Sequence, residues 1–215
     1  MKKQIWKWVG VYGLWRGWLF VLTIMATWFV PLRLGFLARN FFDEHLPDPI
    51  WPWGNMDGDV FMLIARQGYQ ASQLPFFPLY PLTIRGVVMV SGLPYVLAGM
   101  VVSTLAFGGA IYLLWRLLKL DQRSRLFGLI FLLMIFFPTG HYYTAVYNDS
   151  LFLLLSIGTL YFGRSKKFGW ASIWGGLASL TRLNGLALLV YVGAEYLIAL
   201  NPQVKQLKSW QTLRE

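Results

Sequence analysis

The sequence predicts an all-α, polytopic membrane protein with about six transmembrane helices and a short amphipathic helix on the non-cytoplasmic side. Composition is the first reason: 57% of the 215 residues are hydrophobic and 13% are charged, whereas soluble domains carry about 25% charged residues. The second is that apolar runs alternate with short basic clusters. We treat residues 1–215 as a single transmembrane domain, in which residues 38–92 form an exoplasmic loop with interfacial helices.

The first apolar run, residues 15–37, is long enough to cross the hydrocarbon, with a kink expected at Pro31. No small-residue cleavage site precedes Arg39, so the run is predicted to be a retained span and not a signal peptide. Residues 39–55 are polar and aromatic and contain three prolines, which indicates an external loop.

An amphipathic helix of about three turns is predicted next, lying on the membrane surface. One face would carry Phe61, Ile64, Ala65 and Gly68, and the other Asp59, Arg66 and Gln70. Prolines at 75, 78 and 81 then exclude an uninterrupted helix over residues 74–85 and predict an interfacial or re-entrant turn. Residues 84–91 are expected to form a short helix.

Five further membrane helices are expected, over residues 93–118, 126–137, 150–162, 168–180 and 186–200. Several of these runs are shorter than the roughly 20 residues that span a bilayer. We therefore expect tilted or broken helices that surround a cavity.

The basic clusters predict the orientation, because cytoplasmic loops carry an excess of Lys and Arg. These clusters are Lys2, Lys3 and Lys7, then residues 116–125, 164–167 and 205–214. Both termini would be cytoplasmic. Asp43, Glu44, Asp48, Asp57, Asp59 and Asp149 would fall on the other side. The expected location is the cell membrane in a prokaryote or the endoplasmic reticulum membrane in a eukaryote.

The net charge of +10 favours anchoring at an anionic leaflet over nucleic-acid binding, since the basic residues stand in short clusters between apolar runs. The chain has no cysteine, which excludes disulfides, thiolate metal sites and cysteine nucleophiles. It has no phosphate-binding glycine loop, HExxH or G-x-S-x-G motif. No cofactor is predicted with certainty. A divalent metal is compatible with the sequence but not indicated by it.

Four segments are predicted to meet on the non-cytoplasmic face: residues 57–59, 76–81, 138–150 and 181–185. Asp57 would either cap the amphipathic helix or act as a catalytic base. Arg182 is the only charge between two apolar runs, and it would bind a lipid-linked phosphate or form an ion pair, with Asp149 as one partner. For Asp149 itself, capping of the following helix is the default expectation.

The sequence resembles the PIG-V-type mannosyltransferases, through four blocks in the family's order. The blocks are Met56-Asp57-Gly58-Asp59 with Ile64-Ala65-Arg66-Gln67-Gly68-Tyr69, Phe76-Phe77-Pro78-Leu79-Tyr80-Pro81-Leu82, Tyr147-Asn148-Asp149-Ser150-Leu151-Phe152, and Thr181-Arg182-Leu183-Asn184-Gly185. The chain departs from the family at Asn55, Met56 and Asp149, where arginine, tryptophan and glutamate are usual. Since the family usually has more than six spans, the chain resembles a short bacterial or archaeal member, or an N-terminal portion.

The resemblance implies a GT-C-type glycosyltransferase that uses a polyprenyl-phosphate sugar, with mannose expected, and a glycan or lipid acceptor on the non-cytoplasmic face. Asp57 would then be the base for inverting attack, and Asp59 would orient the acceptor or tune Asp57. Arg182 would neutralise the departing phosphate. The remaining expected substrate-binding residues are Asn184, Asn148, Asp149, Tyr147 and Tyr80.

Two other functions stay open at this point. One is a catalytically silent membrane subunit that binds the lipid carrier and needs a membrane partner subunit for chemistry. The other is a small transporter, which the absence of a duplicated half in the sequence disfavours.

Overall fold

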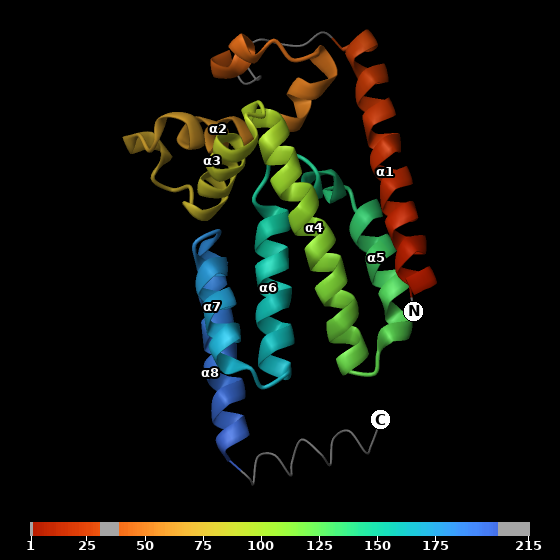
Figure 1. Ribbon diagram of the computed structural model, residues 1–215, viewed down its shortest axis with the longest axis vertical. Helices are drawn as coiled ribbons and strands as arrows, with labels where there is room; N and C mark the ends of the chain where they lie inside the picture. Colours follow the sequence, from red (N-terminus) through yellow and green to blue (C-terminus); the bar gives the residue numbers. More distant parts are fainter. Residues whose placement is uncertain (1, 31–38, 202–215) are drawn as a thin grey trace.

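The computed structural model describes residues 2–30 and 39–201, and all regular secondary structure within these ranges is helical (Figure 1). This confirms the all-α prediction. The α-helices are α1 (Lys2–Phe29), α2 (Asp57–Gln67), α3 (Leu79–Ser91), α4 (Tyr95–Leu120), α5 (Phe127–Phe136), α6 (Asp149–Arg164), α7 (Phe168–Ser179) and α8 (Leu186–Leu200). Short 3-10 helices connect them: η1 (Arg39–Glu44), η2 (Asp48–Gly54), η3 (Ala71–Gln73), η4 (Ser124–Leu126), η5 (Gly140–Tyr143) and η6 (Leu183–Gly185).

Three helical segments in the described ranges are long and apolar enough to cross a membrane: Trp8–Phe29, Tyr95–Leu120 and Leu183–Leu200. The predicted count of about six spans is not confirmed. The 12 residues of α7 would cover only about 18 Å at 1.5 Å per residue, against about 30 Å of hydrocarbon. The predicted first span ends its described helix at Phe29, and the expected kink at Pro31 lies outside the described residues.

The centre of the bundle is formed by α4 and α6, which pack more extensively against each other than any other pair, and α7 packs on the other side of α6. Small residues allow these approaches. A Cβ on Gly158 of α6 would lie 2.0 Å from the Trp174 ring of α7, so only glycine fits there. Such close contacts are typical of helix packing in membranes.

The segment predicted as an external loop forms η1 and η2 and is folded against the bundle. Trp51 and Trp53 of η2 are buried in the main hydrophobic cluster, and Trp53 stacks on Phe20 of α1 with ring centroids 5.1 Å apart. Glu44 accepts a hydrogen bond from the backbone N–H of Tyr95, at 2.9 Å. This contact satisfies a free N–H group at the start of α4.

The predicted amphipathic helix is α2, which buries Phe61, Ile64 and Ala65. Capping by Asp57 is a wrong expectation, because Asp57 is the first helical residue and Met56 holds the cap position without a side-chain cap. The negative charge of Asp57 still suits the first turn of α2, because the N-terminal end of a helix is partly positive. The following helix, α3, begins at Leu79, earlier than expected, since Pro81 falls in its first turn, where no backbone N–H bond is lost.

The two ends of the bundle differ in charge. The α2–α3 end carries Asp57 and Asp59, together with Asp149 at the start of α6 (Figure 1). The opposite end, where α4 and α6 finish, carries the basic residues of 116–125 and 164–167, of which Arg164 pairs with Asp121 at 2.8 Å. The basic residues predicted at 205–214 lie outside the described residues.

Candidate functional site

A cavity of about 280 Å³ opens at the α2–α3 end of the bundle. Its lining comes from four parts of the chain: the start of α2, the turn before α3, the residue before α6, and the segment before α8. The lining residues are Asp57, Phe61, Pro75, Phe76, Phe77, Asn148, Thr181, Arg182 and Leu183. The cavity therefore brings a carboxylate and a guanidinium to the same space.

Asp57 reaches this cavity because a tight turn orients the start of α2. The Asn55 side chain accepts a hydrogen bond from the Met56 backbone N–H at 2.9 Å, and Met56 adopts a positive φ of 55°. Gly58 then packs directly on Val146, where a Cβ would lie 2.9 Å from the carbonyl oxygen. The Asp57 residue is exposed, and its carboxylate makes no hydrogen bond within residues 39–201.

Arg182 is held by a network at the start of α6. Its Nε and Nη2 donate to Asn148 Oδ1 at 3.0 and 2.7 Å, and Nη2 also donates to Asp149 Oδ2 at 2.6 Å. The Asn148 amide in turn donates to the Thr181 carbonyl at 2.9 Å. The ion pair expected as one alternative for Arg182 is thus present.

This pairing corrects the capping role expected for Asp149. Asp149 is the first residue of α6, Asn148 holds the cap position, and neither makes a side-chain cap bond. The Arg182 Nη1 makes no hydrogen bond in the described part of the chain, and 37% of the side chain is exposed. The bonds of Nε and Nη2 therefore fix the plane of the guanidinium, and Nη1 is left to donate hydrogen bonds to a ligand.

Asp59 is half-buried and does not line the cavity. Its Oδ1 is buried without a hydrogen-bond partner among the described residues, and this burial raises the pKa of the carboxyl. A carboxylate in such a place is costly unless it is protonated or paired.

Two tyrosines predicted as substrate-binding residues, Tyr147 and Tyr80, lie outside the cavity lining and make hydrogen bonds within the protein. Tyr147 donates to the Asn55 carbonyl at 3.2 Å, and burial raises its pKa to about 12. Tyr80 is fully buried and lies outside the cavity lining, with its hydroxyl 2.8 Å from Ser103 Oγ and donating to Gly99 O at 3.2 Å. Asn184 is exposed and also lies outside the lining.

Ser103 was missed by the sequence reasoning. It is fully buried in α4, and its hydroxyl donates to the Tyr147 carbonyl at 3.1 Å while it contacts the Tyr80 hydroxyl. The signal in the sequence was a polar side chain inside the apolar run of residues 93–118, where a buried hydroxyl needs a hydrogen-bond partner. Phe61 was assigned to the buried face of α2, and it also lines the cavity.

The described residues contain no group of three His, Asp or Glu side chains placed to hold a metal ion. Of the acidic residues near the cavity, Asp57 lines it, whereas Asp149 contacts the lining residue Arg182 from outside the lining.

The fold and this cavity define a helical membrane protein with a charged, partly aromatic pocket at one end. The family model of Mannosyltransferase (PIG-V) matches residues 14–212, and the chain belongs to this family. Membership supports a glycosyltransferase, with mannose as the sugar, a sugar donor and an acceptor. No curated protein and no solved structure matches the chain.

Proposed function

We propose that this protein transfers mannose from a polyprenyl-phosphate-linked donor to a hydroxyl of a glycan or lipid acceptor, with inversion at the anomeric carbon. The observation that supports this most is that Asp57 and Arg182 line one cavity. Family membership supports the sugar and the reaction class.

Asp57 acts as the general base in this proposal. Its exposed carboxylate takes the proton of the acceptor hydroxyl as the oxygen attacks the anomeric carbon. The new bond joins the acceptor oxygen to that carbon, and the bond from the carbon to the phosphate oxygen breaks. The electron pair leaves on the phosphate, so negative charge develops at the opposite side of the sugar from Asp57.

Arg182 stabilises that leaving phosphate. The Asn148 and Asp149 contacts fix the guanidinium, and the Nη1 edge is left to donate hydrogen bonds. A charged donor held in place before the reaction stabilises developing charge without reorganising. Asp59 lies outside the cavity lining, two residues from Asp57, and tunes that base; Asn184 is exposed two residues from Arg182 and contributes to sugar binding.

The membrane setting completes the proposal. We place α2, α3 and the cavity on the non-cytoplasmic side of a multi-pass, GT-C-like bundle, because the basic clusters at residues 116–125 and 164–167 lie at the other end, where α4 and α6 finish. Phe61, Phe76 and Phe77 line the cavity, and such aromatic surface suits the apolar chain of a lipid-linked donor.

The test is transfer of radiolabelled mannose from polyprenyl-phosphate mannose to candidate acceptors by the purified protein in lipid nanodiscs. Asp57→Asn should abolish transfer while the protein stays folded. Asp48→Asn is the matched control, since Asp48 is exposed in η2 and does not line the cavity.

Transfer that survives Asp57→Asn unchanged would remove Asp57 from its role. If the unmodified protein binds the donor lipid but transfers nothing to any acceptor, the chain is the lipid-binding, non-catalytic subunit considered as the alternative. The same alternative would be supported if the protein binds the donor without transferring mannose and a second membrane subunit restores transfer.

A further inference from the structure

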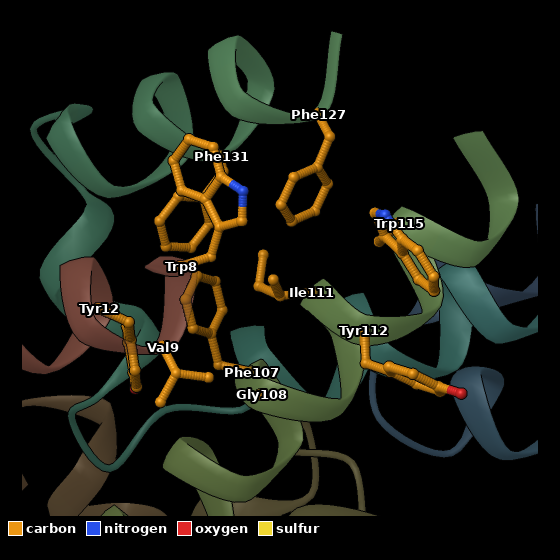
Figure 2. Close-up of a pocket in the computed structure, with 10 residues that line it drawn as sticks. All are labelled: Trp8, Val9, Tyr12, Phe107, Gly108, Ile111, Tyr112, Trp115, Phe127 and Phe131. Carbon is orange, nitrogen blue, oxygen red and sulfur yellow. The ribbon is translucent and has the colours of Figure 1, made fainter. Parts of the chain in front are cut away.

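A second cavity lies at the opposite end of the bundle from Asp57. It has a volume of about 200 Å³ and is enclosed by α1, α4 and α5. Figure 2 shows its aromatic walls, with Trp8, Phe107, Phe127 and Phe131 grouped on one side and Tyr112 and Trp115 on the other. Val9, Tyr12, Gly108 and Ile111 complete the lining.

This apolar cavity adjoins a cationic one. The neighbouring cavity, of about 560 Å³, shares the Tyr112 and Trp115 side chains and is also lined by Arg116, Lys119, Leu120, Gln122 and Tyr161. The Lys119 ammonium lies over the Trp115 ring, 5.5 Å from its centroid. A ligand that occupies both cavities would thus have an apolar part and an anionic part.

Arg116 is the charge best placed for such a ligand. Its Nη1 and Nη2 donate to the hydroxyls of Tyr112 and Tyr161 at 2.9 and 2.7 Å. These partners orient the guanidinium but do not neutralise it. Arg164, at the same end, is instead paired with Asp121 at 2.8 Å.

We propose that this pair of cavities binds an anionic phospholipid from the leaflet at this end of the bundle. One acyl chain fills the cavity between α1, α4 and α5, and the headgroup phosphate binds Arg116 and Lys119. Arg116 lies in the last turns of the long apolar helix α4, which is the depth at which basic side chains meet headgroups. Taken together, the two volumes fall within the scale of about 300–1,000 Å³ found for small-molecule sites.

Two variants separate the two halves of the site. Arg116→Gln removes the charge and keeps a hydrogen-bonding side chain. Gly108→Leu adds a bulky side chain at a residue that lines the apolar cavity, where a Cβ meets nothing within 4 Å, and it also raises helix propensity. Arg125→Gln is the control, since Arg125 is an exposed arginine of η4 that lines neither cavity.

The experiment is native mass spectrometry of the full chain in detergent, titrated with phosphatidylglycerol or with phosphatidylcholine of the same acyl chains. The unmodified protein should retain phosphatidylglycerol more strongly. Arg116→Gln should weaken that binding about five-fold, the equivalent of one basic residue at a membrane surface. Gly108→Leu should reduce retention of both lipids, and Arg125→Gln should match the unmodified protein.

Equal retention of the two lipids by the unmodified protein would overturn the proposal, as would unchanged phosphatidylglycerol binding in Arg116→Gln. Displacement of the lipid by excess inorganic phosphate would identify a free-anion site instead. If Arg116→Gln does not fold, Gly108→Leu decides the question: normal lipid retention in that variant contradicts an acyl chain in the apolar cavity.

Discussion

The Arg182–Asp149 contact allows a structural role of the arginine to be separated from a catalytic one. The variants are Arg182→Gln and Asp149→Asn, each of which breaks the same ion pair, whose atoms lie 2.6 Å apart. A hydrogen bond to a charged group contributes about 1.5–3 kcal/mol. The side chains are 37% and 27% exposed, so solvent screening reduces the expected loss to about 1 kcal/mol in either variant.

Both variants should therefore lower the melting temperature by a similar amount, about 2–4 °C for a chain of this size. Their effects on transfer should differ. Arg182→Gln removes the proposed charge next to the leaving phosphate, which should lower kcat/KM about 10²–10³-fold. Asp149→Asn keeps the guanidinium and its Asn148 contacts, so the expected loss is at most about ten-fold, or about 1.4 kcal/mol.

The assay is the mannose transfer described above, run beside thermal unfolding of both variants in the same nanodiscs. Equal losses of kcat/KM in the two variants, in step with equal losses of stability, would refute the catalytic role of Arg182. The arginine would then only hold α6 against the segment before α8.

Three further predictions concern the surroundings of the cavity. Burial raises the pKa of Asp59, so the folded state favours the protonated carboxyl, and ionisation costs stability at neutral pH. Asp59→Asn should therefore raise the melting temperature near neutral pH. The gain should vanish toward about pH 4, where the carboxyl of the unfolded chain also protonates. A pH-independent difference would contradict this. Gly58→Ala would place a Cβ 2.9 Å from the Val146 carbonyl oxygen, and should cost about 1–3 kcal/mol in unfolding measurements and reduce transfer. Gly86→Ala in α3, where a Cβ meets nothing within 4 Å, is the control and should not lower stability. Tyr80→Phe removes the hydroxyl that donates to the Gly99 carbonyl and contacts Ser103, while Ser103 keeps its hydrogen bond to the Tyr147 carbonyl. The change should cost about 0.5–1.5 kcal/mol, with transfer retained once the protein is folded; selective loss of transfer would instead mean that Tyr80 binds substrate.

The helices themselves were largely predictable, because apolar runs bounded by basic clusters or turn residues set their limits. Residues 186–200 were predicted as a helix, and α8 spans Leu186–Leu200. The span at 93–118 appears as α4, from Tyr95 to Leu120. Crossing of the membrane was less predictable, since α6 and α7 are helices of 16 and 12 residues whose depth depends on their tilt.

The site was predictable as a set of segments but not as a set of contacts. Asp149 has the sequence context of a helix cap, yet its carboxylate contacts Arg182, 33 residues away. The sequence named this ion pair only as one alternative for Arg182, because the local pattern does not show how α6 and η6 pack. In the same way, Tyr80 belongs to a motif block but turns into the core toward Ser103.

The length of α6 links the two ends of the molecule. Its 16 residues begin at Asp149, beside Arg182, and its Tyr161 contacts Arg116 near the other end. Such a helix is about 24 Å long, which is less than the roughly 30 Å of hydrocarbon. With α6 crossing the bilayer, as we propose, at least one of the two arginines lies at or below the headgroup boundary, where an uncompensated charge is costly. Arg182 meets that cost with a carboxylate, which leaves only its Nη1 edge for a substrate phosphate. Among the residues that the structure describes, Arg116 has only neutral hydroxyl partners, so a lipid phosphate is the counter-ion that would satisfy it.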